Sequence, residues 1–405
     1  MTIDKINKGL QMKATSLDSL PNHWEVVKLG NYMTIYSGDS PSNLQFNENG
    51  IPYFKVDDLN RSAKYMVDSK LNIANQNIKK VVPKGSLIFP KRGAAILTNK
   101  IRILTEDSYF DTNIMGVKVD EEQFDREFLY YFLLNKGLYK IADTSTIPQL
   151  NNKHIQPLLI PKPPINEQRK IAAILATWDK AIDYKERMLE EKRKVKRGLM
   201  ERLLSGKVRL PGFQNEWIKV KFRDVMSFLK KRPVKDPYNY YLLTVKLYLK
   251  GIEATDKKPN ITVKGRPYYI RDPGELLIGR QNFHNGGMGM VPEGMVNYVA
   301  SNAISSVHGI KGNLKFYYYY MSNPNFYKRI ELLIGGTGQK EISEAMMKQL
   351  RLFIPSDEKE QTAIVHLLET ADNELNLLEE ELLQVKQQKE GLMQLLLTGK
   401  VNVSV

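Results

Sequence analysis

The sequence has no cysteine, only five histidines and no apolar run long enough to cross a membrane. Without cysteine the chain cannot form disulfides, thiolate zinc sites or a cysteine nucleophile, and its composition suits a reducing compartment. The N-terminal segment MTIDKINKGLQMK lacks the apolar core of a secretory signal. Because 42% of the residues are hydrophobic, we expect well-developed buried cores. Because a secretory signal and a membrane-length apolar run are both missing, we expect a soluble cytoplasmic protein.

Motifs that carry enzyme chemistry are also missing. A DNA amino-methyltransferase needs an [NDS]-P-P-[YFW] motif, and the nearest segments, NPNF at 323–326 and DPYN at 236–239, lack the second proline and are typical of helix ends or turns. GGTGQKE at 335–341 lacks the GK[ST] ending of a phosphate-binding loop, and no Pro-Asp dipeptide begins a nuclease motif. The histidines are scattered without metal-ligand spacing. We therefore expect no catalytic site, no cofactor and no metal.

What the sequence does contain is a long internal repeat. GLMERLLSGKV begins at residue 198 and GLMQLLLTGKV begins at residue 391, an offset of 193. The same offset separates Trp24 from Trp217 and Gln168 from Gln361. A period of this length indicates a tandem of whole domains and not a solenoid.

Two stretches of the chain are typical of long helices. Residues 166–204 and 356–397 contain no proline and one glycine each, near the end, and Asn166 is the expected N-cap of the first. Apolar residues recur every seven positions on two adjoining stripes, which predicts a coiled-coil seam. The stripes are Leu175, Ile182, Leu189, Lys196 and Leu203 with Ile174, Ala181, Met188 and Val195, and then Leu368, Leu375, Leu382, Lys389 and Leu396 with Ile364, Ala371, Leu378, Val385 and Leu392.

Each seam contains one lysine, Lys196 or Lys389, at equivalent positions of the repeat. A lysine in a seam can fix the register at a cost in stability. Alternatively, its ammonium group can extend out of the seam to water. The sequence leaves both interpretations open.

The two stretches carry opposite charge. Residues 166–204 have eleven basic and seven acidic residues, whereas residues 356–397 have three basic and ten acidic residues. Opposite charge on similar seams predicts that the two helices pair with each other, against the alternative of two solvated faces. The whole chain carries +15, so the remaining segments together carry +18. That concentration of positive charge favours a nucleic-acid partner.

The segments at about 21–160 and 211–355 have short apolar runs broken by turn signals. Strands are expected at 53–59, 86–93 and 114–119, and at 240–247, 275–283 and 303–310. Short helices are expected at 124–136 and 314–321, and the aromatic run FYYYY at 316–320 is expected to be core and not a base-stacking platform. Each segment is predicted to be an α+β domain with a mixed, mainly antiparallel sheet. The two copies are much less alike than the helical stretches.

Together these features resemble the specificity subunit of type I restriction-modification systems. The residues that carry the resemblance are IPKPPINEQRKIAAIL (160–175) and GLMERLLSGKVRLPGF (198–213), with their second copies IPSDEKEQTAIVHLL (354–368) and GLMQLLLTGKV (391–401). WEVVKLGNYMTIYSG (24–38) resembles the opening of a target recognition domain. The second copy departs from the P-P-x-x-E-Q pattern at 356–360, where the local turn should differ. The resemblance covers essentially the whole chain.

The resemblance implies target recognition domains at 1–160 and 208–355, with helical spacers at 161–207 and 356–405 that pair as an antiparallel coiled coil. Each domain would read one half of a bipartite double-stranded DNA target. Two modification subunits would methylate adenine, and motor/nuclease subunits can join them. The repeated phrase would then give two identical partners two equivalent docking surfaces, through pairing within one chain and not through a homo-oligomer.

Two other functions remain open at this stage. A standalone methyltransferase or nuclease would bind S-adenosylmethionine or cleave DNA alone, and the missing motifs count against it. A coiled-coil adaptor that binds only protein would show no salt-sensitive DNA binding, and the charge of the globular segments counts against it.

Reading DNA requires cations at phosphates and forked polar side chains at base edges, beside glycines that allow close approach. A solvated surface charge is the competing interpretation at each position. In the first domain the candidates lie in the loop YSGDSP (36–41) and beyond it: Ser37, Gly38, Ser40, Lys55, Asp57, Lys91, Arg92, Gly93, Asn113 and Gln149. In the second domain they are Lys230, Lys231, Arg232, Lys246, Arg280, Gln281, Asn282, Asn302, Thr337, Gln339 and Lys340.

Overall fold

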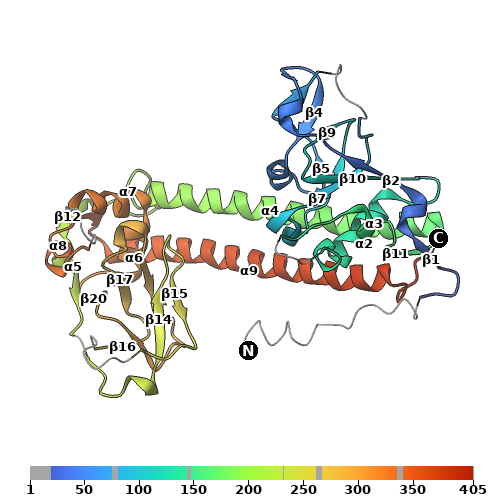
Figure 1. The fold of residues 1–405 in the computed structure, drawn as a ribbon. Helices are drawn as coiled ribbons and strands as arrows, with labels where there is room; N and C mark the ends of the chain where they lie inside the picture. Colours follow the sequence, from blue (N-terminus) through green and yellow to red (C-terminus); the bar gives the residue numbers. More distant parts are fainter. Residues whose placement is uncertain are drawn as a thin grey trace. The chain divides into compact units, whose positions relative to one another are not determined.

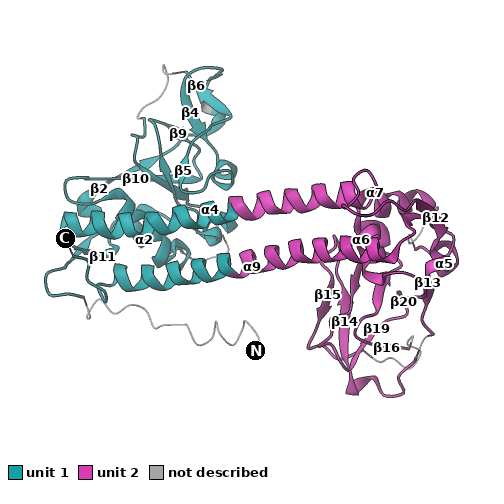
Figure 2. Cartoon of the chain, turned by 180° about the vertical axis from the view of Figure 1, so that it is seen from behind, with its two compact units in different colours: residues 1–186, 381–405 teal, residues 187–380 magenta. Residues whose placement is uncertain are grey.

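The computed structural model describes residues 20–74, 81–143, 147–230, 232–260, 267–334 and 341–404. The chain divides into two compact units, residues 1–186 with 381–405 and residues 187–380 (Figure 2). Two long helices, α4 (Ile165–Leu203) and α9 (Glu358–Leu397), each pass from one unit into the other. Each unit therefore contains one globular domain and a part of both long helices (Figure 1).

Both long helices were predicted to within two residues. The expected N-cap was wrong, because α4 begins at Ile165 and includes Asn166. The backbone N–H of Gln168 donates to the carbonyl of Pro164 over 3.0 Å, so the helix starts directly after the proline pair. No described helix is both long enough and apolar enough to span a membrane.

The first domain contains two larger sheets and one small one. One has the order β2-β10-β7-β8-β5, another β3-β6-β4-β9, and β1 pairs with β11. Pairing is antiparallel except for β4 with β9 and β5 with β8. The strands are β1 (Glu25–Lys28), β2 (Met33–Ser37), β3 (Phe46–Asn47), β4 (Ile51–Phe54), β5 (Tyr65–Met66), β6 (Leu71–Ile73), β7 (Leu87–Pro90), β8 (Arg102–Leu104), β9 (Tyr109–Phe110), β10 (Ile114–Val119) and β11 (Leu159–Lys162), with helices α2 (Arg126–Lys136) and α3 (Asn152–Ile155).

The second domain follows the same plan. Its sheets have the orders β13-β20-β17-β18, β15-β14-β19-β16 and β12-β21, and among the described strands of this domain only β14 and β19 pair in parallel. The strands are β12 (Trp217–Lys221), β13 (Met226–Phe228), β14 (Tyr241–Val245), β15 (Ile252–Ala254), β16 (Tyr269–Arg271), β17 (Leu276–Gly279), β18 (Met288–Met290), β19 (Tyr298–Ala300), β20 (Ile304–Gly309) and β21 (Arg351–Pro355). The helices are α5 (Phe222–Val225), α6 (Leu314–Ser322), α7 (Pro324–Tyr327) and α8 (Glu344–Met347).

The α+β class, the mainly antiparallel sheets and the two short helices are confirmed, as is the core position of the aromatic run: Phe316 and Tyr317 are fully buried. Three expected strands end at least three residues early, the one at 53–59 at Phe54, the one at 86–93 at Pro90 and the one at 275–283 at Gly279. The strand expected at 53–59 stops at Phe54 because Asp58 accepts a hydrogen bond from the Lys55 N–H over 2.7 Å and turns the chain into a 3-10 segment, Val56–Asn60. The strand expected at 275–283 stops at Gly279, followed by a turn.

The E-Q pair of the repeat attaches each domain to its long helix. Gln168 is fully buried, and its side chain accepts from the N–H of Asp125, the N-cap of α2, over 2.9 Å. Gln361 accepts in the same way from the N–H of Asn313, the N-cap of α6, over 2.9 Å. A glutamine in both copies therefore fixes where the short helix of each domain starts.

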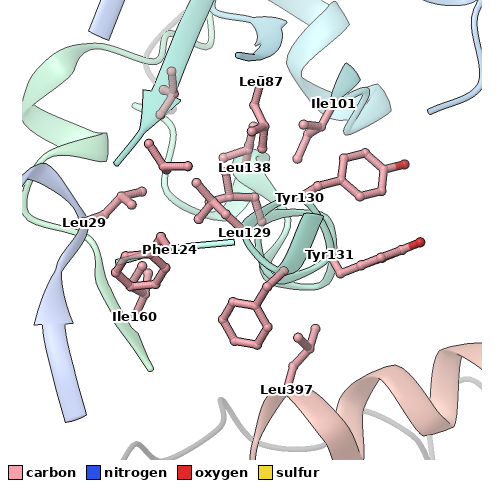
Figure 3. Close-up of a cluster of buried hydrophobic side chains, with 14 of the residues drawn as sticks. Leu29, Leu87, Ile101, Phe124, Leu129, Tyr130, Tyr131, Leu138, Ile160 and Leu397 are labelled. Atoms are coloured by element: carbon pink, nitrogen blue, oxygen red, sulfur yellow. The ribbon is translucent and has the colours of Figure 1, made fainter. Parts of the chain in front are cut away.

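The repeated phrase occupies a domain core in both copies. Leu203, the last residue of α4, and Leu204 directly after it are buried in the core of the second domain. Leu396 and Leu397 of α9 are buried in the core of the first domain, where Leu397 points toward α2 (Figure 3). The phrase recurs because each long helix ends in the hydrophobic core of a different domain, and each core needs the same leucine pair.

The backbone conformation explains why the repeated phrase contains a glycine after the leucine pair. Gly206 has a φ of 71° and Gly399 a φ of 65°, a left-handed conformation that favours glycine after a helix. An added Cβ would lie 3.2 Å from Trp217 at the first glycine and 2.3 Å from Pro21 at the second. The chain therefore turns tightly against the start of each domain.

Helices α4 and α9 pair antiparallel, and the opposite charges face each other. In the first unit Lys185 binds Glu381 over 2.8 Å and Lys386 binds Glu186 over 2.6 Å. In the second unit similar pairs form: Lys192 with Glu374 over 2.5 Å and Arg193 with Glu379 over 2.6 Å. The predicted pairing is confirmed. The second stripe of α4 is wrong at Ala181 and Val195, which are exposed, because the seam of α4 is narrower than two full stripes.

The two seam lysines bind aspartates of the opposite helix. Lys389 binds Asp179 and Lys196 binds Asp372, and these aspartates are also 193 residues apart. Each aspartate accepts a second hydrogen bond from a domain tyrosine, Tyr131 on α2 or Tyr319 on α6. The lysines therefore do not extend freely to water. Each one joins both long helices and the short helix of one domain.

Because of these two tyrosines, we expect the stability of the folded protein to fall at alkaline pH. Burial, and then the hydrogen-bonded aspartate, raise the pKa of Tyr131 and of Tyr319 well above the ordinary value near 10. The folded state keeps a proton that the unfolded state releases above that pH, so this stabilisation is complete below about pH 10 and is lost as the pH rises. We expect the free energy of unfolding to fall by about 1.4 kcal/mol per pH unit for each tyrosine. Urea unfolding at several alkaline pH values measures this slope.

The matched control for this experiment is an exposed tyrosine on α4. Tyr131→Phe or Tyr319→Phe should flatten the dependence on pH, whereas Tyr184→Phe, at a side chain that is 68% exposed, should not. An unchanged slope in the Tyr131 and Tyr319 variants would contradict the expectation.

Candidate nucleic-acid interface

The first-domain candidates lie in segments that the backbone brings together. The Lys91 N–H donates to the Asn113 carbonyl over 2.8 Å, and Arg92 bridges to Gln149. Gly93 donates to Pro148 over 2.9 Å, and its φ of 71° lets the chain turn directly after the two cations. These contacts place both cations and the two amide side chains at one edge of the domain.

The loop at 36–41 reaches the same edge. Ser37 ends β2 opposite Met115 of β10. Gly38 packs so closely on β9 that a Cβ would lie 1.7 Å from the Phe110 carbonyl, so only glycine fits. The next residues are held by Asp39, whose N–H donates to that carbonyl over 3.2 Å. Ser40 follows and bonds its hydroxyl to that of Ser42 over 2.8 Å.

Lys55 and Asp57 join this group through Asp111, which donates its N–H to the Phe54 carbonyl over 3.0 Å and accepts from the Asn113 N–H over 2.6 Å. The side chains of Lys55 and Asp57 are both exposed. Backbone contacts therefore connect the segments that carry the ten first-domain candidates, and we name these segments the first reading edge.

Lys91 has the most unusual surroundings at this edge. Burial, and then the neighbouring Arg92, lower the pKa of Lys91 below its usual range, while Asp111 acts in the opposite direction. A half-buried ammonium group beside an arginine is stabilised by an added anion. A DNA phosphate would supply that charge.

The second domain has an equivalent edge with different chemistry. Ile342 donates its N–H to the Arg280 carbonyl over 3.1 Å, as Leu150 does to Lys91 over 2.9 Å. Arg280 is therefore the counterpart of Lys91. Its guanidinium, however, binds Glu341 over 2.6 Å and is only 11% exposed. At the position where the first edge has the half-buried Lys91, the second edge therefore has a cation that is neutralised by an acidic residue.

Two other cations of the second domain also form ion pairs with acidic residues. Arg232 binds Asp272, and Lys246 binds Glu253 over 2.5 Å. Lys230 is exposed. Lys231, Thr337, Gln339 and Lys340 lie outside the described residues. These ion pairs were not predicted from the sequence. The acidic partners of Arg232 and Arg280 lie 40 and 61 residues away, and Lys246 meets Glu253 only when β14 pairs with β15.

A polar pocket of about 340 Å³ lies at this edge. Gln281, Asn282 and Ser301 contribute to its lining, and Asn302 follows at the end of β19. Asn282 is exposed, and its N–H donates to the Gly279 carbonyl over 3.0 Å. We name this surface, with the turn at 246–251 beside it, the second reading edge.

The segments closest to catalytic motifs have structural roles. Asn323 of NPNF caps α7 by accepting from the Asn325 N–H over 2.9 Å. Asp236 of DPYN accepts from the Tyr238 N–H over 3.1 Å in a 3-10 turn. Among the described residues no cluster of His, Asp and Glu has metal-site geometry.

Comparison with known proteins decides the family. The model of the type I restriction modification DNA specificity domain matches residues 21–192 and again residues 214–387. The chain belongs to this family. The two matches start 193 residues apart, as the internal repeat predicted, and each specificity domain includes most of the long helix that follows it.

Relatives match over nearly the full chain. The putative type I restriction enzyme MjaX specificity subunit of Methanocaldococcus jannaschii is 24% identical and is covered to 98%, as is this chain. The MjaVIII specificity subunit of the same organism is also 24% identical, over 95% of this chain and 94% of its own. Among solved structures, the S subunit from M. genitalium has a TM-score of 0.57 at 14% identity, covering 97% of this chain and 100% of its own.

A second solved chain, from work on assembly and conformational transition of the type I R-M system, has a TM-score of 0.62 at 16% identity, over 94% of this chain and 99% of its own. These structures share the fold.

One prominent feature of the second specificity domain was not predicted from the sequence. Tyr248 is 70% exposed at the tip of the hairpin formed by β14 and β15. Its backbone conformation is not readable from a single sequence. The lysine and glycine that follow, Lys250 and Gly251, are a turn signal that could have directed attention to it.

Proposed function

We propose that this chain reads a bipartite DNA target for a type I restriction-modification complex, one half with each specificity domain. The domains would follow the segments 1–160 and 208–355, and the helical pair 161–207 and 356–405 would set the gap between the half-sites. The chain itself would catalyse nothing. Two modification subunits would dock on the repeated surfaces and methylate adenine, and motor/nuclease subunits would join them in the cytoplasm.

One observation carries this proposal: the two domains are alike where they attach to the helices and differ where they would read DNA. The attachment uses Gln168 or Gln361 and an aspartate–lysine pair in both copies. The reading edges differ, with Lys91 half-exposed in one and Arg280 ion-paired in the other. A shared frame with different edges supports two readers of different half-sites on one scaffold.

The experiment is a domain exchange. Residues 211–350 are replaced by the corresponding segment of a related specificity subunit, and adenine methylation is mapped in cells that also contain the modification subunit. We expect one half of the methylated sequence to change and the other half to stay. A change in both halves, or in neither, would contradict the proposal. The same exchange at residues 21–160 is the matched control and should change the opposite half.

A further inference from the structure

The hairpin of β14 and β15 is a projecting feature of the second specificity domain. The two strands pair antiparallel from Leu243–Ala254 to Val245–Ile252, and the connecting residues 246–251 form the tip. Tyr248 at this tip is 70% exposed. In the first domain the corresponding strand β4 pairs antiparallel with β6, but the connection runs through the 3-10 segment Val56–Asn60 and β5 and forms no short hairpin tip.

The tip has a strained backbone. Tyr248 and Leu249 both have a φ of 58°, the left-handed region that disfavours residues with a Cβ. Such conformations persist only where surrounding contacts enforce them, and they concentrate at functional sites. Here the Tyr248 N–H donates to the Asn285 carbonyl over 2.8 Å, and the Leu249 N–H to the Gly286 carbonyl over 3.0 Å.

The side chains of the two strained residues differ in burial. Leu249 packs against the core of the second domain, so its side chain contributes to stability. The Tyr248 ring remains exposed, so burial offers no compensation for its backbone conformation. Because a glycine at this position would be free of strain, the ring is a candidate for contact with something outside the chain.

The tip lies beside the polar pocket of the second reading edge. Thr244 and Val245, at the end of β14, line this pocket together with Gln281 and Asn282. The loop that holds the tip, 282–287, also supplies Asn282 and Gly287 to the lining. Tyr248 therefore extends from the rim of the surface that carries the amide side chains.

We propose that Tyr248 contacts base pairs in the half-site read by the second specificity domain. This inference rests on the proposed function. A two-stranded β ribbon fits the major groove of B-DNA, which is about 12 Å wide. At the tip of such a ribbon, the tyrosine ring contacts a thymine methyl group or an adjacent base edge, and its hydroxyl group hydrogen-bonds in the groove.

The neighbouring charges suit this placement. Residues 241–258 contain four lysines and two acidic residues. Lys250, two residues beyond Tyr248, is exposed, and it can meet a phosphate while the ring faces the bases. Lys246, at the start of the tip, is partly neutralised by Glu253.

The test uses the full chain in cells with its modification subunit and maps methylated adenines. The variants are Tyr248→Gly, which removes the ring and the strain, and Tyr248→Phe, which removes only the hydroxyl group. Tyr238→Gly is the control, since Tyr238 is 60% exposed but precedes β14 at the opposite end of the strand. Thermal unfolding of each purified variant is measured in parallel.

For Tyr248→Gly we expect the methylation rate at the wild-type sequence to fall about 10- to 100-fold, or one or more positions of a single half-site to become degenerate. Its unfolding midpoint should equal or exceed that of the wild type, because the strain is gone. Tyr248→Phe should lie between, and Tyr238→Gly should match the wild type in methylation.

Unchanged methylation in Tyr248→Gly overturns the inference, as does a lowered unfolding midpoint or an equal loss in Tyr238→Gly. Relaxation in both half-sites overturns it as well. If the wild-type chain itself directs no interrupted methylated sequence, the proposed function fails, and that result is distinguished by the wild-type sample alone.

Discussion

A chain that ends after Lys207 is expected to form a homodimer that rebuilds the helix pair. Such a half-chain keeps the first domain and α4 but loses α9, whose Met393, Leu396 and Leu397 belong to the core of that domain. At the repeat offset of 193, α4 carries Met200, Leu203 and Leu204. A second copy of the half-chain can therefore place the same residue types in the same core.

The polar contacts between the helices are retained in part in this dimer. Asp179, which binds Lys389 in the intact chain, would meet Lys196 of the other copy, and Glu186, which binds Lys386, would meet Arg193. The partner of Lys185, Glu381, has no acidic equivalent, since position 188 is Met. The dimer therefore keeps its seam and loses part of its charge complementarity.

The free energy gained by burying the apolar seam exceeds the cost of repulsion between like charges, which favours dimerisation. Each seam leucine contributes about 1.5–3 kcal/mol when it is buried, whereas an exposed pair of like charges costs a few tenths of a kcal/mol. The dimer should be strengthened by salt, because salt screens repulsion between two α4 helices of net positive charge. Sedimentation equilibrium at low and high NaCl concentration measures both effects.

Leu189→Asp in the half-chain is the control, since Leu189 is buried in the seam at 6% exposure. That variant should be monomeric. With the modification subunit, the wild-type half-chain should direct methylation of a palindromic interrupted sequence that contains the first half-site twice. A monomeric half-chain that directs methylation of the full asymmetric sequence would refute the repeat architecture.

Arg209→Ala is expected to destabilise the second unit by about 3 kcal/mol. The carboxylate of Glu360 is fully buried and accepts two hydrogen bonds from the Arg209 guanidinium, over 2.5 and 2.6 Å. Removing the arginine leaves a buried charge without its cation, and the one other hydrogen bond to Glu360 from the described part of the chain comes from the Trp217 ring N–H at 3.5 Å. Hydrogen exchange measured by mass spectrometry, on peptides of each unit, reports the local loss of stability.

The first unit provides a matched comparison. Glu167 is the counterpart of Glu360, but its partners are the Trp24 ring N–H over 3.1 Å and His23 over 3.0 Å. His23 is 54% exposed, so His23→Ala should cost less than about 1 kcal/mol. Replacing both members of the buried pair, Arg209→Met with Glu360→Leu, should recover much of the loss, because no buried charge is left unpaired. Equal effects of Arg209→Ala and His23→Ala would contradict this account.

The sequence by itself determined the plan of the molecule. The 193-residue offset identified two tandem copies, and heptads without proline defined α4 and α9 to within two residues. The opposite charges of the two helices indicated their pairing, which the ion pairs between them confirm. These features were readable because they depend on local periodicity, on composition and on residues compared at one fixed spacing.

Only the tertiary structure decided which contacts the individual residues make. The leucine pair at 396–397 fills the core of a domain that begins more than 370 residues earlier in the chain. The same holds for charge: Lys91 and Arg280 occupy equivalent positions, yet Glu341 neutralises only the arginine. The turn at Tyr248 was marked in the sequence only by Lys250 and Gly251, and its strained φ was not readable, because hydrogen bonds from Tyr248 and Leu249 to residues 285 and 286 across the fold enforce it. Long-range packing selects these partners, and spacing along the chain does not encode them.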